Sequence, residues 1–160
     1  MVECLKKAFF EQNMEDILKY SKNLRKNILY MAKVAGSNSS HIGGALSCID
    51  LISVLFKKYF DFKDINNQDR DRFILSKGHA ATAQYVNLAH KGFISKKKLN
   101  NYTLQNSHLE EHPNPSINGV EAATGSLGHG LPIGCGIALA AKIKKKKIQN
   151  SCAFRRWRVQ

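Results

Sequence analysis

An α/β fold is predicted by two segments, each of which leads from a turn or loop directly into a helix. Residues 72–75 form a short apolar strand, which stops at Ser76-Lys77-Gly78 and is followed by a helix over residues 80–90. A strand, a glycine turn and a helix make up the unit of α/β folds, in which ligands bind at the carboxyl ends of strands. Residues 119–136 read G-V-E-A-A-T-G-S-L-G-H-G-L-P-I-G-C-G and lead into an apolar, alanine-rich helix at residues 137–143.

The remaining elements follow from the spacing of apolar residues. Apolar side chains recur at helical spacing over residues 14–35, which predicts an amphipathic helix that ends near Gly36. The other predicted segments are a polar loop over 37–44, an apolar helix over 46–60, a polar connector over 61–72, a short helix over 95–102 and an irregular loop over 103–118.

The glycine-rich segment predicts a site for an anion. Gly125, Gly128, Gly130 and Gly134 fall within ten residues. Glycines let backbone N–H groups converge without an obstructing Cβ, and the first turn of a helix adds unpaired donors and a partial positive charge. Pro132 fits near the helix start because a proline there loses no intrahelical bond. Such an arrangement suits phosphate.

A turn that only packs a helix closely is the alternative for a glycine-rich segment of this kind. The residues G-S-L-G-H-G do not match G-x-G-x-x-G, and no Walker lysine follows them. The segment alone leaves both interpretations open. The histidine-containing segments that precede it favour the anion site.

The composition fits one globular domain. The chain has 160 residues, of which 43% are hydrophobic, and it contains no apolar run of membrane-spanning length and no signal-peptide pattern, so a cytoplasmic protein without a membrane partner is expected. The four cysteines form no C-x-x-C pair, which predicts thiols without a metal. The net charge of +13 allows an alternative function, a noncatalytic basic protein that binds nucleic acid or another polyanion. Lysine-rich solvated helix faces are the more common cause of such charge, so a nucleic-acid partner is not expected.

Several motifs together resemble the N-terminal, thiamine diphosphate-binding part of transketolase. The similarity extends over residues 14–147 and is greatest to the split form, in which this part is a separate polypeptide. The residues D-R-D-R-F-I-L-S-K-G-H have the transketolase form rather than that of deoxyxylulose phosphate synthases. The motifs are Ser40-His41-Ile42-Gly43-Gly44, Asp69 to His79, His112-Pro113, Gly119-Val120-Glu121 and the glycines that follow. The resemblance implies a thiamine diphosphate-binding fold, incomplete in this chain, with a parallel sheet and helices on both faces.

The resemblance also implies roles for individual residues. His41 and His112 would act in catalysis, through proton transfer or contacts with sugar hydroxyls, although a histidine before a helix is otherwise a simple capping or loop residue. Glu111 stands where the family usually has glycine before His112, so the loop is expected to be distorted if that glycine is needed for a positive φ or for a close approach. The cofactor-binding residues implied by the match are His79, Gly125, Ser126, Leu127, Gly128 and His129, the last being glutamine in many transketolases and histidine in the split type.

The resemblance implies thiamine diphosphate and Mg²⁺ as cofactors and sugar phosphates as substrates. A two-carbon ketol unit would pass from a ketose phosphate to an aldose phosphate, with the cofactor supplying the carbanion chemistry. The glutamate that activates the aminopyrimidine belongs to the pyrimidine-binding part, so a C-terminal subunit or domain and a homodimer mate are expected as partners. The family's metal ligands, an Asp in G-D-G-E and a later Asn, are missing here. No metal site and no activity are therefore expected for this chain alone.

The residues from 148 to 160 depart from the family pattern, and residues 1–147 are taken as the family-like domain. Arg155, Arg156 and Arg158 cannot lie unpaired inside a covered parallel sheet. Codons for Arg155 to Gln160 can be written CGG AGA TGG AGA GTG CAA, and the same bases read from the second nucleotide encode G-D-G-E-C. The hypothesis is that this tail is translated out of frame after the lysine run. A gene sequence in which no single-nucleotide shift restores G-D-G-E would refute it.

Overall fold

The computed structural model describes residues 2–38, 41–60, 64, 66–67, 69–145 and 150–153. Helices dominate this part of the chain, and no helix in it is both long and apolar enough to cross a membrane. The elements in chain order are α1 (Val2–Ala35), η1 (Gly36–Asn38), α2 (Ile42–Leu46), α3 (Ile49–Val54), the π-helical turn η2 (Leu55–Tyr59), β1 (Arg72–Leu75), the short turn η3 (Gly78–Ala80), α4 (Ala81–Lys91), η4 (Lys96–Asn101), α5 (Gly130–Ile143) and β2 (Asn150–Ala153).

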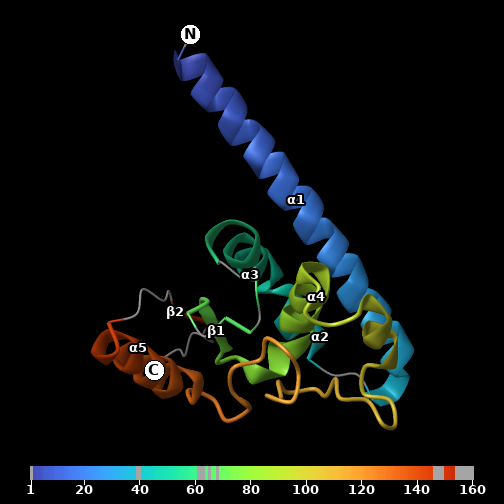
Figure 1. Ribbon diagram of the computed structural model, residues 1–160. Helices are drawn as coiled ribbons and strands as arrows, with labels where there is room; N and C mark the ends of the chain where they lie inside the picture. The colour runs from blue at the N-terminus through green and yellow to red at the C-terminus, as the bar shows by residue number, and fades with distance from the viewer. Residues whose placement is uncertain are drawn as a thin grey trace, which may run out of the picture.

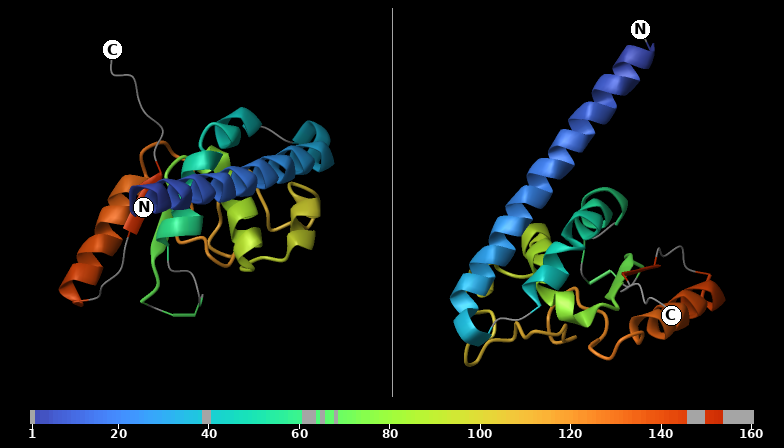
Figure 2. Two further views of the ribbon diagram at one scale, coloured as in Figure 1. Left: turned by 90° about the horizontal axis from the view of Figure 1, so that it is seen from above. Right: turned by 180° about the vertical axis from the view of Figure 1, so that it is seen from behind.

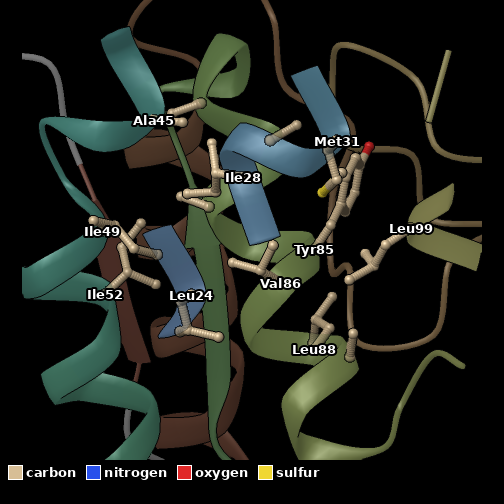
Figure 3. Packing of buried hydrophobic residues seen from close by; sticks show 14 of the residues in the cluster. Leu24, Ile28, Met31, Ala45, Ile49, Ile52, Tyr85, Val86, Leu88 and Leu99 are labelled. Carbon is tan, nitrogen blue, oxygen red and sulfur yellow. The ribbon is translucent and has the colours of Figure 1, made fainter. Parts of the chain in front are cut away.

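The helix α1 supplies one wall of the core. It ends at Ala35 as predicted but begins at Val2 rather than Met14, and its first turns project away from the rest of the chain (Figure 1). Leu24, Ile28 and Met31 recur at helical spacing on one face and are fully buried. Figure 3 shows these side chains meeting apolar residues of α2, α3 and α4. Burial of this stripe holds α1 against the other helices.

The predicted strand is confirmed at residues 72–75, and a second strand lies beside it. β1 pairs with β2 in parallel, with Arg72 opposite Asn150 and Leu75 opposite Ala153. Figures 1 and 2 place this pair between α5 on one side and α3 and α4 on the other. On the second side, the ring of Phe73 packs edge-on against Phe56 at 5.1 Å. Two strands do not confirm the larger predicted sheet.

β2 lies within residues 148–160, the tail that the sequence analysis separates from the domain. Its backbone pairs with β1, so this stretch is a strand. The arginines at 155, 156 and 158, on which the out-of-frame hypothesis rests, lie outside the described residues. The hypothesis stays a prediction.

The apolar helix α5 is largely exposed in the described chain. It begins at Gly130, so Pro132 lies in its first turn as predicted, and within it only Gly130 and Ala141 are buried. Leu131, Leu139 and Ile143 are 48%, 58% and 72% exposed. Apolar surface of this extent along one helix indicates a contact face.

The helix predicted over residues 46–60 is confirmed from Ile49 to Tyr59, where α3 continues into η2, but its predicted start is wrong, because a separate helix α2 ends at Leu46 and extends back into the predicted loop. The break falls at Ser47 and Cys48, where the Cys48 backbone leaves helical geometry with a φ of −120°. At this break Lys77 donates hydrogen bonds to the Gly44 carbonyl oxygen and to Ser47 Oγ, both at 2.8 Å. A contact with a residue so distant in sequence leaves no sign in local apolar spacing.

Candidate functional site

The turn after β1 carries the first group of candidate residues. Ser76 and Lys77 follow the strand directly, Gly78 begins η3, and His79 is its second residue. These side chains therefore lie at the carboxyl end of β1, where α/β folds bind ligands. The predicted placement of His79 between the strand and the next helix is confirmed.

The loop that precedes α5 lies against this turn, and residues 125–130 of it are called the glycine loop below. Thr124 Oγ1 donates a hydrogen bond of 2.6 Å to the carbonyl oxygen of Leu75, the last residue of β1. At the other end of the loop, the Gly130 N–H donates to Ser76 Oγ at 3.2 Å. The glycine loop is thus fixed at both ends to the strand and its turn. Figure 1 shows the orange segment before α5 running beside the green turn that follows β1.

Gly78 makes this approach possible. A Cβ on Gly78 would lie 2.3 Å from the Thr124 carbonyl oxygen and 2.9 Å from the Gly125 nitrogen. Real Cβ atoms do not come so close to backbone atoms, because the overlap would force the two segments apart. The glycine is needed here for a close backbone contact rather than for an unusual φ.

Three histidines from separate segments converge beside the glycine loop, and His41, His79 and His112 are called the histidine cluster below. The ring centroid of His41 lies 5.3 Å from that of His79 and 6.3 Å from that of His112. A Cβ built on Gly125 would lie 3.2 Å from His112 Cδ2, so the loop touches the cluster directly. The structure therefore brings together the histidines that the sequence analysis selected.

His41 is held in an unusual backbone conformation. It precedes α2 as predicted, with a φ of 61° and a ψ of 15°, in the left-handed region that residues other than glycine seldom adopt. Its side chain makes no capping bond to α2, so the alternative of a simple capping residue is not supported. Strain of this kind collects at functional sites, where surrounding contacts maintain it.

His112 reaches the histidine cluster from an irregular loop. Glu111 is not among the residues with positive φ, so a glycine is not needed at this position for its backbone conformation. Whether a close approach requires the glycine stays a prediction. The Tyr85 hydroxyl on α4 lies 3.0 Å from the carbonyl oxygens of both Glu110 and His112. This tyrosine ties the irregular loop of residues 103–118, called the histidine loop below, to the core.

The loop amides, and not the helix start, are available as donors for the predicted anion site, so the helix-start part of the expectation is corrected. The first two N–H groups of α5 are already bonded, Gly130 to Ser76 and Leu131 to the Gly128 carbonyl, and Pro132 has none. In the described structure, no protein group accepts from the N–H groups of residues 125–128, which are exposed. Four amides next to imidazoles suit an anion.

His129, the last predicted cofactor residue, lies immediately before α5 and is exposed. Its side chain caps no N–H group of that helix. Among the described residues its ring packs against no ring of the histidine cluster. The structure therefore places His129 beside the glycine loop but apart from the cluster.

A buried ion bridge supports the segment that enters the glycine loop. Glu121 binds Arg70 with one carboxylate oxygen and Arg72 with the other, the latter at 2.9 Å. The Glu121 side chain is 9% exposed and that of Arg70 is 8% exposed. In such a dry environment a carboxylate shared by two guanidinium groups fixes the loop relative to the start of β1.

No group of three or more His, Cys, Asp or Glu side chains in the described part of the chain could hold a metal ion. Cys48 and Cys135 are free thiols, and burial raises the pKa of the Cys48 thiol. The described residues thus do not fit the Mg²⁺ that the resemblance implies.

Comparisons with known proteins support the same interpretation. Residues 20–153 match the model of a family described as transketolase, thiamine diphosphate binding domain. The chain belongs to the transketolase family. The family match continues to residue 153, beyond the predicted boundary at residue 147, and the position of that boundary stays a prediction.

Relatives in the transketolase family include separate subunits and longer enzymes. The chain is 41% identical over 135 residues to one of the subunits of apulose-4-phosphate transketolase from Phocaeicola vulgatus, covering 80% of this chain and 45% of the relative. Human transketolase is 35% identical over 134 residues, which are 82% of this chain and 21% of that one. Transketolase from Campylobacter jejuni superposes with a TM-score of 0.76 at 31% identity, over 86% of this chain and 23% of that structure. The chain spans about half the length of the apulose-4-phosphate transketolase subunits that it matches.

The residues that hold the site together were not predicted from the sequence. Lys77 and Ser76 belong to the quoted motif, yet nothing in the motif indicates their bonds to Ser47 and Gly130. Tyr85 lies inside an apolar helix, where an aromatic residue ordinarily predicts core packing. In the sequence, the only sign of its contact with the histidine loop is a polar hydroxyl within an apolar helix.

Proposed function

We propose that this chain is the diphosphate-binding part of a thiamine diphosphate-dependent enzyme that transfers a two-carbon ketol unit between sugar phosphates. The observation that supports this most strongly is the convergence of the histidine cluster on the exposed amides of the glycine loop. Family membership supports the cofactor, and the names of its relatives support the substrate class.

The residues present fit the diphosphate group. In this proposal His79 and the backbone of Gly125, Ser126, Leu127 and Gly128 donate hydrogen bonds to phosphate oxygens, with His129 at the edge of the loop. Gly44 and Gly125 have no side chains, which leaves space beside the imidazoles. A Cβ on Gly44 would lie 3.1 Å from His79, and a Cβ on Gly125 would lie 3.2 Å from His112. Bound thiamine diphosphate would supply the carbanion stabilisation that ketol transfer requires.

His41 and His112 are proposed to act on the sugar phosphate substrate. Their ring centroids lie 6.3 Å apart, and the centroid of His41 lies 5.3 Å from that of His79. An imidazole near neutral pH can accept or donate a proton and can bind a hydroxyl. The two histidines would orient sugar hydroxyls and exchange protons with them.

Turnover is proposed to need a C-terminal transketolase subunit or domain, a homodimer mate and metal ligands from outside the described residues. The exposed apolar face of α5 supports a contact with such a partner, because it lies next to the glycine loop and is uncovered. The isolated chain is expected to transfer no ketol unit. A cytoplasmic location stays a prediction.

The alternative function, binding of nucleic acid or another polyanion, gains no support from the structure. Lys96, Lys97 and Lys98 lie in η4, whereas Lys142 and Lys144 lie at the end of α5. Figures 1 and 2 show these two segments on opposite sides of the molecule. These two groups of lysines therefore do not form one continuous basic surface of the kind that binds nucleic acid.

Replacing His79 with alanine tests the proposed diphosphate contact. Thiamine diphosphate is expected to bind the chain weakly, yet more tightly than thiamine, and His79→Ala should lower its affinity about ten-fold because a charge-assisted hydrogen bond to phosphate is lost. His108→Ala, which removes an exposed imidazole outside the histidine cluster, should leave the affinity unchanged. The measurement is a calorimetric titration with both ligands, with and without Mg²⁺.

Equal affinity for thiamine and thiamine diphosphate would contradict the diphosphate site. An equal loss of affinity in His108→Ala would contradict the role of His79. Because the described residues hold no metal group, Mg²⁺ is expected to change the affinity little. Tight binding that depends on Mg²⁺ would contradict that expectation and would place metal ligands outside the described residues.

A further inference from the structure

The hydroxyl group of Tyr85 connects the core to the histidine loop through two carbonyl groups. The side chain projects from α4 and is fully buried, and its Oη lies 3.0 Å from the Glu110 oxygen and 3.0 Å from the His112 oxygen. A phenol carries one proton, so the hydroxyl shares it between two acceptors two residues apart. This contact fixes the backbone on both sides of Glu111.

The surroundings of Tyr85 keep its hydroxyl group protonated, so that it can donate a hydrogen bond. Burial raises the pKa of Tyr85, and the nearby Tyr102 and Glu110 raise it further. The phenol therefore stays protonated over the pH range in which proteins are stable. A permanent donor is what two converging carbonyl oxygens require, because two acceptors without a proton between them would repel each other.

The His112 ring depends on the same backbone. It contacts Gly125 on the glycine loop and lies 6.3 Å from His41. The histidine loop has no regular secondary structure of its own between η4 and α5, so its position rests on contacts of this kind. Pro113, which is buried, follows His112 and donates no hydrogen bond of its own.

We propose that Tyr85 is a positioning residue that sets the place of the His112 imidazole over the glycine loop. This rests on the proposed function, in which His112 contacts the sugar phosphate. Tyr85 touches neither substrate nor cofactor in this proposal and acts only through the His112 backbone. The role is distinct from core packing, which its aromatic ring would provide equally well without the hydroxyl.

The test is Tyr85→Phe, observed through the side-chain NMR resonances of the six histidines in the full chain without ligand. The His112 resonance is expected to shift more than any other, while those of His41 and His79 move little. The matched control is Tyr20→Phe, which removes another buried hydroxyl in contact with α4, bonded at 2.8 Å to Asn87. This control should lower stability similarly and leave the His112 resonance unchanged.

An unmoved His112 resonance in folded Tyr85→Phe would overturn the proposal, and so would an equal shift in Tyr20→Phe, since either would reduce Tyr85 to a packing residue. A second measurement uses the unmodified chain, whose Tyr85 hydroxyl proton should exchange slowly with water. Rapid exchange of that proton would overturn the proposal even if the variant failed to fold. None of these measurements involves a cofactor. A negative result in them is therefore distinguishable from a failure of thiamine diphosphate to bind in the calorimetric titration.

Discussion

Replacing Gly78 with alanine is expected to abolish thiamine diphosphate binding and to lower the free energy of unfolding by about 3 kcal/mol, the upper part of the range for overpacked sites. The added Cβ would meet the Thr124 carbonyl oxygen at 2.3 Å. Since that oxygen belongs to the backbone, no side-chain rotation can relieve the overlap. The glycine loop would have to move away from the turn after β1. Its amides and His79 could then no longer donate to the same diphosphate.

Gly136→Ala is the matched control for this substitution. Gly136 lies inside α5, and a Cβ there meets nothing within 4 Å. Because alanine has the higher helix propensity, the control should be neutral or stabilising by up to about 1 kcal/mol. Urea unfolding and a cofactor titration of both variants give the comparison. Unchanged affinity in Gly78→Ala would show that the contact between turn and loop does not matter for binding.

The second large effect is expected from Glu121→Gln, which should lower the free energy of unfolding by about 3 kcal/mol. The substitution removes the charge that Arg70 and Arg72 share, while Arg70 keeps a side chain that is only 8% exposed. A buried guanidinium that loses its carboxylate keeps the cost of leaving water and loses the attraction that offset it. The start of β1 and the entry to the glycine loop should loosen together.

An exposed ion pair of the same chain provides the comparison for Glu121. Asp50 pairs with Arg25, and their side chains are 65% and 38% exposed. Asp50→Asn should cost less than about 1 kcal/mol, as is usual for solvated pairs. Urea unfolding of the two variants measures the difference. Similar small losses in both would mean that the Glu121 bridge is no stronger than a surface contact.

Local signals in the sequence predicted the elements around the site well. The strand at residues 72–75 and the end of α1 at Ala35 are confirmed, because an apolar run before a glycine turn and a helix before Gly36 depend on neighbouring residues only. Breaks imposed by distant contacts were not predictable. The division between α2 and α3 involves Lys77, which lies about thirty residues away in sequence.

The candidate site shows the same limit. His41, His79 and His112 were selected through a family resemblance, and only coordinates could show that the His41 ring lies 5.3 Å from that of His79 and 6.3 Å from that of His112. Gly78 was a turn residue in the sequence, whereas its function as the contact point for Thr124 depends on the packing of two segments. The Gly130 N–H group at the start of α5 was expected to be available to an anion, but it is already bonded to Ser76. A hydrogen bond from a backbone N–H group to a side chain distant in sequence cannot be predicted from the sequence alone.

The most direct measurement of the central claim, that the histidine cluster and the glycine loop form one diphosphate site, follows all six histidine side chains by NMR during titration with thiamine diphosphate and with thiamine. Resonances of His41, His79 and His112 should move with thiamine diphosphate and stay in place with thiamine. His90, whose ring packs on Tyr20 at 4.6 Å, and the exposed His108 should not respond. Shifts confined to His90 and His108, or an identical response to both ligands, would contradict a diphosphate site at this cluster.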